Sequence, residues 1–141
     1  MFIRIDDSIS VAGQLAPADI AAAAAQGFRT VVNNRPDDEG PDQPPGAAIA
    51  EAAAAAGLRY VAIPVAGGFS TRQVEAMAAA LAEAEGPVLA FCRSGTRSTN
   101  LWALAAASQG GDPEAIVAAA AAGGYDIGAL LPTLRQLSAR A

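Results

Sequence analysis

The sequence contains no histidine, and this absence excludes several kinds of active site at once. Ser-His-Asp and Cys-His catalysis, zinc held by histidine, and acid–base chemistry by imidazole all need that side chain. Cysteine is almost as scarce, because Cys92 is the only one in the chain. One cysteine cannot form an internal disulfide, and a structural zinc site needs more ligands of this kind. We therefore expect no metal site and no other cofactor.

Long apolar segments are also missing. Gln26, Gly57, Glu83 and Gly110 interrupt the alanine-rich stretches, and alanine is only weakly apolar, so we expect no membrane-spanning segment. The residues after Met1 do not show the basic region followed by an apolar region that marks a signal peptide. We therefore predict a cytoplasmic protein, in which reducing conditions keep the cysteine thiol reactive.

Basic residues are in the minority. The 9 lysines and arginines face 14 acidic residues, which gives a net charge of −5 and a sequence pI near 4.5. Nucleic acids and anionic lipids bind basic surfaces, so neither is expected as a partner. On an acidic protein, the arginines on either side of Ser94 and Gly95 form a locally basic segment beside Cys92.

The length and composition fit one folded domain. The 141 residues are enough for a single core, and 52% of them are hydrophobic while only 16% are charged. Disordered segments have the opposite balance. We therefore expect residues 1–141 to form one domain.

Short β-branched segments alternate with alanine-rich segments along the chain. Strands are expected at Phe2–Ile5, Ile9–Ala12, Phe28–Asn33, Leu58–Ile63 and Val88–Phe91. Helices are expected at Pro17–Gln26, at Ala47–Ala56, from a Ser70/Gln73 capping box onward, from the Cys92 loop to Ser108, from an Asp112 N-cap to Gly123, and around Leu130–Leu137. This alternation predicts a single α/β domain whose mainly parallel central sheet is flanked by helices. The run Val88–Phe91 is the most apolar and is expected at the centre of the sheet.

Cys92 directly follows this central strand and precedes a helix, at the edge where open α/β sheets bind ligands. The backbone of the next six residues can curl so that its N–H groups point inward, and the helix start adds positive charge. Gly95 allows the backbone torsions that such a curl requires. The sequence therefore predicts an anion-binding loop made of Cys92, Arg93, Ser94, Gly95, Thr96, Arg97 and Ser98.

The same loop is expected to make the thiol a nucleophile. A helix start and nearby cations lower the pKa of a cysteine, so that the thiolate forms at neutral pH. Arg97 can hold a tetrahedral oxyanion by a two-pronged contact, and Ser98 can donate a hydrogen bond to the sulfur. The alternative is an inert buried cysteine at the end of a strand. A structural cysteine does not need the glycine, arginines and hydroxyls that follow this one.

The motif Cys-x-x-Gly-x-Arg-Ser is similar to the active-site loop of rhodanese-type sulfurtransferases. From Ile5 to Tyr125, the chain also resembles the beta-lactamase hydrolase-like phosphatase family (DUF442). The matching segments include Gly13-Gln14, Gly27–Val31, Asn33–Asp37, Ile63–Val65, Gly86–Val88, Phe91–Ser98 and Leu101–Ala103. The resemblance implies a fold like that of tyrosine and dual-specificity phosphatases, with a rhodanese-like fold as the alternative. It also implies a persulfide dioxygenase-like hydrolase as a possible partner, because relatives are fused to such enzymes or encoded beside them.

Three departures from the phosphatase pattern favour sulfur over phosphate. Tyrosine phosphatases have Cys-x5-Arg, whereas Arg97 comes one position earlier, so the loop is expected to fit a phosphoryl group poorly. The histidine that precedes the phosphatase cysteine is replaced by Phe91. The loop Pro64–Phe69, where a phosphatase carries a proton-donating aspartate, has no acidic residue. Expulsion of sulfite or an acidic thiol needs little help from an acid.

The acidic segment Asp37–Glu39 is the place to look for a substitute acid, with Asp37 as the first candidate and a solvated turn as the alternative. Arg35, just before it, has two candidate roles: substrate binding, or pairing with these carboxylates. Gln14 is within possible reach of the site, but no role is assigned to it. Trp102 is interpreted as a packing residue.

The leading hypothesis is a rhodanese-like sulfurtransferase. Cys92 takes the outer sulfur of thiosulfate or of a persulfide, while Arg97 and the loop N–H groups hold the departing anion, and a thiol or cyanide then collects the sulfur. The substrate is thus expected to be a small sulfur-containing anion or a persulfide. The alternatives are a cysteine-dependent phosphatase of the tyrosine or dual-specificity type, and a non-catalytic anion-binding module.

Overall fold

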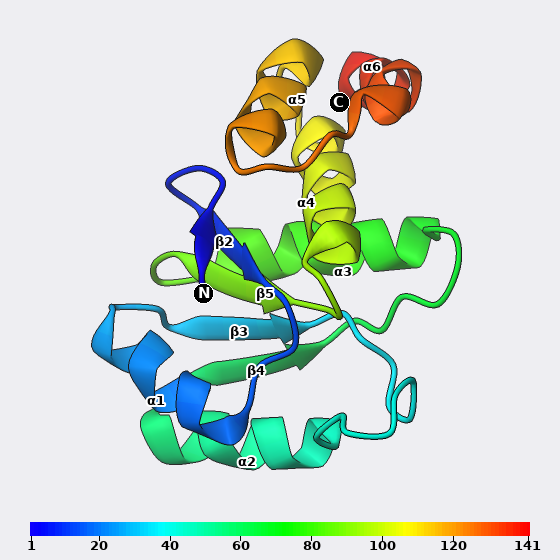
Figure 1. The fold of residues 1–141 in the computed structure, drawn as a ribbon. Coiled ribbons are helices and arrows are strands. Elements are labelled where there is room, and N and C mark those ends of the chain that lie inside the picture. Colours follow the sequence, from blue (N-terminus) through cyan, green and yellow to red (C-terminus); the bar gives the residue numbers. More distant parts are fainter.

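The computed structural model describes all 141 residues, arranged around a five-stranded sheet (Figure 1). The strands are β1 (Ile3–Arg4), β2 (Ile9–Ala12), β3 (Thr30–Asn33), β4 (Arg59–Ala62) and β5 (Val88–Phe91). Their order is β1-β2-β5-β3-β4; β1 is antiparallel to β2, and the other neighbouring pairs are parallel. The predicted α/β fold with a mainly parallel sheet is confirmed, and β5 is its central strand.

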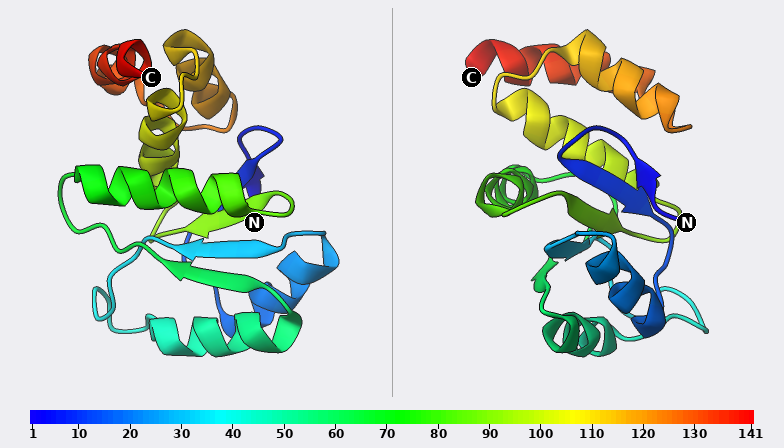
Figure 2. Two further views of the ribbon diagram at one scale, coloured as in Figure 1. Left: turned by 180° about the vertical axis from the view of Figure 1, so that it is seen from behind. Right: turned by 90° about the vertical axis from the view of Figure 1, so that its left-hand side faces the viewer.

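Helices cover both faces of the sheet in separate layers (Figures 1 and 2). The elements are α1 (Pro17–Ala25), α2 (Gly46–Ala56), α3 (Thr71–Glu83), α4 (Thr96–Ser108), α5 (Pro113–Ala122), a 3-10 turn (Gly128–Leu130) and α6 (Leu131–Arg140). The helices α1 and α2 lie on one face, and α3 and α4 lie on the other. The helices α5 and α6 pack against α4, farther from the sheet. None of these helices is long and apolar enough to cross a membrane.

Local sequence signals fix where several helices begin. At α3, the Gln73 N–H donates to the Ser70 hydroxyl at 3.1 Å, and the Gln73 side-chain oxygen accepts from the Ser70 N–H at 2.8 Å. At α5, the Asp112 carboxylate accepts the N–H of Ala115 at 3.1 Å. These bonds satisfy N–H groups that have no partner inside the helix. The capping box at Ser70 and the N-cap at Asp112 are both as predicted.

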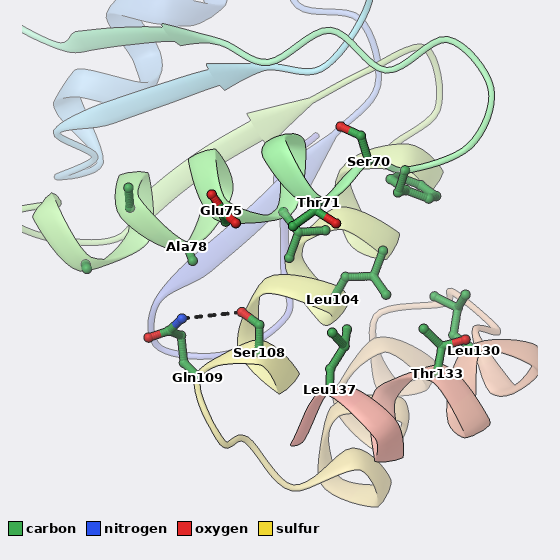
Figure 3. Close-up of a pocket in the computed structure, with 14 residues that line it drawn as sticks. Ser70, Thr71, Glu75, Ala78, Leu104, Ser108, Gln109, Leu130, Thr133 and Leu137 are labelled. Atoms are coloured by element: carbon green, nitrogen blue, oxygen red, sulfur yellow. Dashed lines mark hydrogen bonds between the residues drawn. The ribbon is translucent and has the colours of Figure 1, made fainter. Parts of the chain in front are cut away.

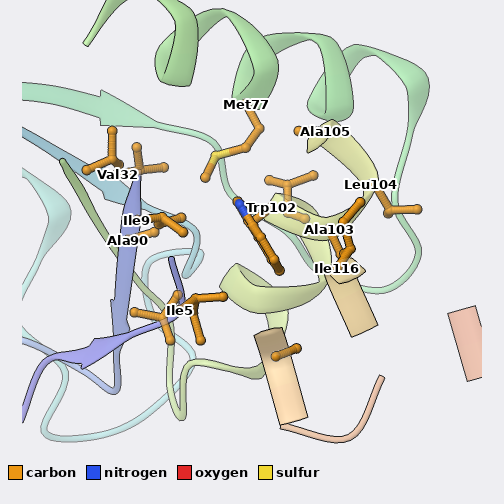
Figure 4. Close-up of a cluster of buried hydrophobic side chains, with 14 of the residues drawn as sticks. Ile5, Ile9, Val32, Met77, Ala90, Trp102, Ala103, Leu104, Ala105 and Ile116 are labelled. Atoms are coloured by element: carbon orange, nitrogen blue, oxygen red, sulfur yellow. The ribbon is translucent and has the colours of Figure 1, made fainter. Parts of the chain in front are cut away.

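The hydrophobic core has two parts, one on each side of the sheet. Within β5, Val88 and Ala90 belong to the larger part under α3 and α4, while Leu89 and Phe91 belong to the smaller part under α1 and α2. This alternation follows from the two-residue period of a strand. In the larger part, Met77 points from α3 toward the centre of the cluster, where Trp102 lies (Figure 4). The interpretation of Trp102 as a packing residue is therefore confirmed.

Candidate active site

Three parallel strands end at one edge of the sheet and bring the residues after them together. Cys92 follows β5, Asn34 follows β3, and Gln14 comes shortly after β2. The Asn34 N–H donates to the carbonyl of Phe91 at 2.8 Å, and the Gln14 N–H donates to the carbonyl of Arg93 at 3.3 Å. The cysteine loop is thus fixed to both neighbouring strands before any side chain contributes.

Cys92 lies at the base of a turn that leads from β5 into α4, and only 1% of it is exposed. Gly95, the last residue before α4, has φ +90°, a conformation that favours glycine. Its N–H donates to the Cys92 Sγ at 3.1 Å. Burial raises the pKa of the Cys92 thiol, but the backbone N–H groups of Ser98, Ser94 and Gly95 lower it by more than burial raises it, so the net pKa is below its ordinary value. The turn therefore stabilises a thiolate.

Ser98 connects α4 to β3 as well as facing the sulfur. Its hydroxyl donates to Asn34 Oδ1 at 2.8 Å, and Asn34 Nδ2 donates to the carbonyl of Ile63 at 3.0 Å. All three residues are buried. A hydroxyl has one proton to donate, so Ser98 can donate it to Cys92 only by releasing Asn34. The predicted bond from Ser98 to the sulfur thus competes with a structural bond.

Hydrogen bonds hold the two terminal nitrogens of the Arg97 guanidinium group. Its Nη1 donates to Glu39 Oε2 at 2.7 Å and to the carbonyl of Val65 at 2.8 Å, and its Nη2 donates to Glu39 Oε1 at 2.8 Å. A guanidinium has five N–H groups, so Nε–H and one N–H of Nη2 remain. The bond to Glu39 raises the pKa of Arg97, and the charge of Cys92 adds to this effect. The two remaining N–H groups form one edge that suits an oxyanion.

Arg35 occupies the second of its two candidate roles in this structure. Its side chain is 8% exposed, its Nε donates to Glu39 Oε1 at 3.0 Å, and its Nη1 donates to Gln14 Oε1 at 3.0 Å. Glu39 therefore bridges Arg35 and Arg97. Gln14, to which no role was assigned, is the side chain that orients the buried arginine.

Of the acidic segment, Glu39 rather than Asp37 reaches the loop. The Asp37 carboxylate accepts the N–H of Gly46 at 2.8 Å and is thus engaged at the start of α2. The hydrogen bond from Arg97 is the main cause that lowers the pKa of Glu39 to about 2, and Arg35 contributes to the shift. Glu39 is therefore an anion at neutral pH, so neither carboxylate is arranged as a proton donor. The prediction of Asp37 as the acid has no support in this geometry.

The remaining loop residues lie at its rim. Arg93, Ser94 and Thr96 are exposed, and the hydroxyls of Ser94 and Thr96 share a hydrogen bond of 3.0 Å. The carbonyl of Arg93 is 3.0 Å from the position that a Cβ would take at Gly13, so the segment after β2 packs closely on the loop. The side chains of Arg93, Ser94 and Thr96 therefore face solvent at the mouth of the loop.

Tyr125, which the sequence did not indicate, also contacts the loop. It follows α5, and its hydroxyl donates to the carbonyl of Ser94 at 2.9 Å. Burial raises the pKa of Tyr125, and the charge of Cys92 raises it further, so its hydroxyl is protonated at neutral pH. Only the folded structure identifies Tyr125 as a residue that contacts the cysteine loop.

The largest cavity is separate from this chemistry. It is an apolar cleft of about 700 Å³ between α3, α4 and α6, lined by residues such as Ala78, Leu104 and Leu137 (Figure 3). None of residues 92–98 lines it. A smaller cavity of about 350 Å³ has Arg93 and Glu39 in its wall and no hydrophobic lining residue. The space beside the cysteine loop is therefore polar.

The fold and the site together define the class: a tyrosine-phosphatase-like α/β domain with one cysteine at the base of the loop between its central strand and the next helix. Within this class, the chain belongs to the family described as "beta-lactamase hydrolase-like protein, phosphatase-like domain", whose model matches residues 2–109.

Two curated relatives are similar to this chain. It is 43% identical over 109 residues to the beta-lactamase hydrolase-like protein of Agrobacterium fabrum, an alignment that covers 77% of this chain and 25% of that protein. It is 35% identical over 136 residues to the protein of that name from Xylella fastidiosa (strain Temecula1), covering 95% and 32%. The chain thus spans only 25% to 32% of the length of these relatives.

Solved structures agree with this assignment. A candidate phosphatase from Neisseria meningitidis superposes with a TM-score of 0.82 at 31% identity, and the alignment covers 96% of each chain. Tk-PTP in its active form gives a TM-score of 0.69 at 20% identity over 99% of this chain, which shows likeness of fold alone. The predicted family and the tyrosine-phosphatase-like fold are confirmed.

The prediction of a sulfurtransferase is wrong. The family that matches is described as phosphatase-like, and the Neisseria structure is that of a candidate phosphatase. The prediction relied on counting residues between Cys92 and Arg97. The guanidinium, however, is positioned at the end of a long side chain by Glu39 and Val65, which lie outside the loop. A difference of one residue in the loop therefore does not by itself set the space for an anion. The persulfide dioxygenase-like partner stays a prediction.

Proposed function

We propose that this domain is a cysteine-dependent phosphatase that hydrolyses phosphate monoesters. The observation that carries the proposal is the Gly95 N–H on the Cys92 Sγ at 3.1 Å, in a turn that stabilises the thiolate. The proposed substrate is thus a phosphate ester, and not the sulfur-containing anion that the sequence analysis favoured. The family match and the Neisseria structure support the same reaction.

The reaction has two steps. In the first, the Cys92 thiolate attacks phosphorus, the S–P bond forms as the bond from phosphorus to the ester oxygen breaks, and the alcohol leaves with a proton from solvent. In the second, water attacks phosphorus, the S–P bond breaks, the water gives a proton to solvent, and inorganic phosphate leaves. The free edge of Arg97 and the inward N–H groups stabilise the charge on the phosphoryl oxygens in both steps.

The arrangement favours esters whose alcohol is a good leaving group. Proton donation by a placed acid contributes roughly 10²–10⁴-fold to such reactions. Glu39 is held ionised by Arg97, and Asp37 is engaged at Gly46. Aryl phosphates, whose phenols leave as stable anions, are therefore expected to react faster than alkyl phosphates.

Hydrolysis of p-nitrophenyl phosphate tests the proposal. We expect Cys92→Ser to abolish turnover and Arg97→Lys to lower kcat/KM about 10²–10³-fold, because a lysine cannot make the two-pronged contact. Arg59→Lys is the matched control, since Arg59 is an exposed arginine that pairs with Glu83. It should leave the rate unchanged. Turnover that persists in Cys92→Ser would rule out this mechanism.

A further inference from the structure

The position of Tyr125 links a distant part of the chain to the nucleophile. Tyr125 lies beyond residues 2–109, the part that matches the family model. Its half-buried side chain returns to the cysteine loop, where its hydroxyl donates to the Ser94 carbonyl at 2.9 Å. It is one of two tyrosines in the chain.

One peptide group lies between this hydroxyl and the sulfur. The Ser94 carbonyl and the Gly95 N–H belong to the same peptide unit, and in a trans peptide they point in opposite directions. The carbonyl end accepts from Tyr125, and the N–H end donates to the Cys92 Sγ at 3.1 Å. A hydrogen bond at the carbonyl also polarises the N–H of that peptide and strengthens its own bond.

This peptide group needs to be held. Gly95 has no Cβ and can adopt φ of either sign, so the peptide before it can rotate at little cost. A rotated peptide would turn the Ser94 carbonyl, a negative dipole end, toward the thiolate. The contact with Tyr125 is also a reason why residue 95 is a glycine, because a Cβ at this position would lie 2.2 Å from the Tyr125 oxygen.

We propose that Tyr125 is a positioning residue that holds the Ser94–Gly95 peptide with its N–H directed at the Cys92 sulfur. This role rests on the proposed function only in taking Cys92 as the working nucleophile. The titratable groups that act on Cys92 are Arg97 from α4 and Tyr125 itself. Arg97 supplies charge, and Tyr125, which stays protonated at neutral pH, supplies orientation.

The rate at which iodoacetamide alkylates the single cysteine, measured against pH, tests this role. Tyr125→Phe removes only the hydroxyl, so we expect the profile to move to higher pH. Below the midpoint of the wild-type profile, alkylation should slow about three- to tenfold, because at such a pH each unit in pKa changes the thiolate fraction tenfold. The kcat for p-nitrophenyl phosphate should fall with it, while KM changes little. Tyr60→Phe is the matched control, because the Tyr60 hydroxyl accepts from Asn33 and does not touch the loop.

Gly95→Ala tests the same contact from the other side and serves if Tyr125→Phe does not fold. Its methyl group would displace the Tyr125 hydroxyl and would also strain the turn at φ +90°, and both effects should shift the profile in the same direction. Profiles for Tyr125→Phe and Gly95→Ala that coincide with that of the wild type would overturn the proposal. A shifted alkylation profile in a protein that hydrolyses no phosphate ester would support the role of Tyr125 and overturn the proposed function instead.

Discussion

At the scale of single residues, Glu39 determines where the Arg97 guanidinium lies. It takes one end of that group by two hydrogen bonds and leaves the other edge for an anion. We expect Glu39→Gln to lower kcat/KM for p-nitrophenyl phosphate about 10–100-fold, because a charge-assisted bond contributes roughly 1.5–3 kcal/mol. Steady-state kinetics of the wild type, Glu39→Gln and Glu39→Asp would measure this loss, with partial recovery expected for the aspartate.

Glu83→Gln is the matched control for this change, since Glu83 pairs with an exposed arginine away from the loop. The alternative role for Glu39 is a carboxylate that competes with the substrate for Arg97. In that case Glu39→Gln would raise kcat/KM and tighten inhibition by inorganic phosphate. Either result would contradict the positioning role.

The candidate site residues whose proximity could be predicted from the sequence are those that stand together in the chain. The Cys92–Ser98 run places nucleophile, glycine and arginine within one turn, so its spacing was enough to predict their proximity. Glu39 was considered only as part of an acidic segment, because the chain path through an irregular loop decides which carboxylate faces Arg97. Tyr125 lies on a separate layer, and no local pattern indicates its contact with Ser94.

At the scale of elements, the loop between β3 and α2 is attached to α4 by charge. Glu39 carries this attachment, because Arg97 and Arg35 together lower its pKa from 4.5 to about 2. A depressed carboxyl pKa contributes stability above the unfolded value of 4.5, and this contribution is lost as the pH falls through about 2. The wild type should therefore be more stable than Glu39→Gln at pH 6, and the difference should shrink toward pH 2.

Thermal unfolding of the two proteins from pH 6 to pH 2 measures this difference in Tm. A constant difference across that range would mean that the Glu39 charge does not stabilise the loop. Glu83→Gln again provides the comparison, because an exposed ion pair such as that of Glu83 with Arg59 contributes little to folding.

Elements were predictable where their ends carry a chemical signal. The Ser70 capping box and the Asp112 N-cap can be recognised in the sequence because a short polar side chain precedes a segment whose apolar residues recur with helical spacing. The long segment between β3 and α2, residues 34–45, is irregular and carries no such signal. Its internal bonds, such as that from Gln43 Nε2 to the Pro36 carbonyl at 2.8 Å, depend on torsions that the residue types do not fix.

At the scale of the whole molecule, one leucine secures the outer helical layer. Leu134 is the only fully buried residue of α6, which packs on α4 and α5. We expect Leu134→Ala to lower the free energy of unfolding by about 2–5 kcal/mol in urea titrations, as for other buried leucines. Leu137→Ala is the control, since Leu137 is partly exposed at the apolar cleft and should cost less (Figure 3). Equal losses would show that Leu134 does not anchor α6.

The fold as a whole makes the site by bringing the ends of β2, β5 and β3 to one edge. That arrangement followed from the alternating pattern of strands and helices. The chemistry at this edge could not be predicted in the same way, because we used the length of the loop to decide between sulfur and phosphate. The family and the solved relatives overturn the choice of sulfur, and the contacts that Arg97 makes outside the loop explain why loop length did not decide the question.

The most direct test of this account is the intact mass of the protein after rapid acid quench of its reaction with p-nitrophenyl phosphate. The account predicts a species heavier by one phosphoryl group, present in the wild type and absent in Cys92→Ser. A parallel incubation with thiosulfate should leave the mass unchanged. A gain of one sulfur from thiosulfate, with no phosphoryl species at any time of quench, would contradict the central claim.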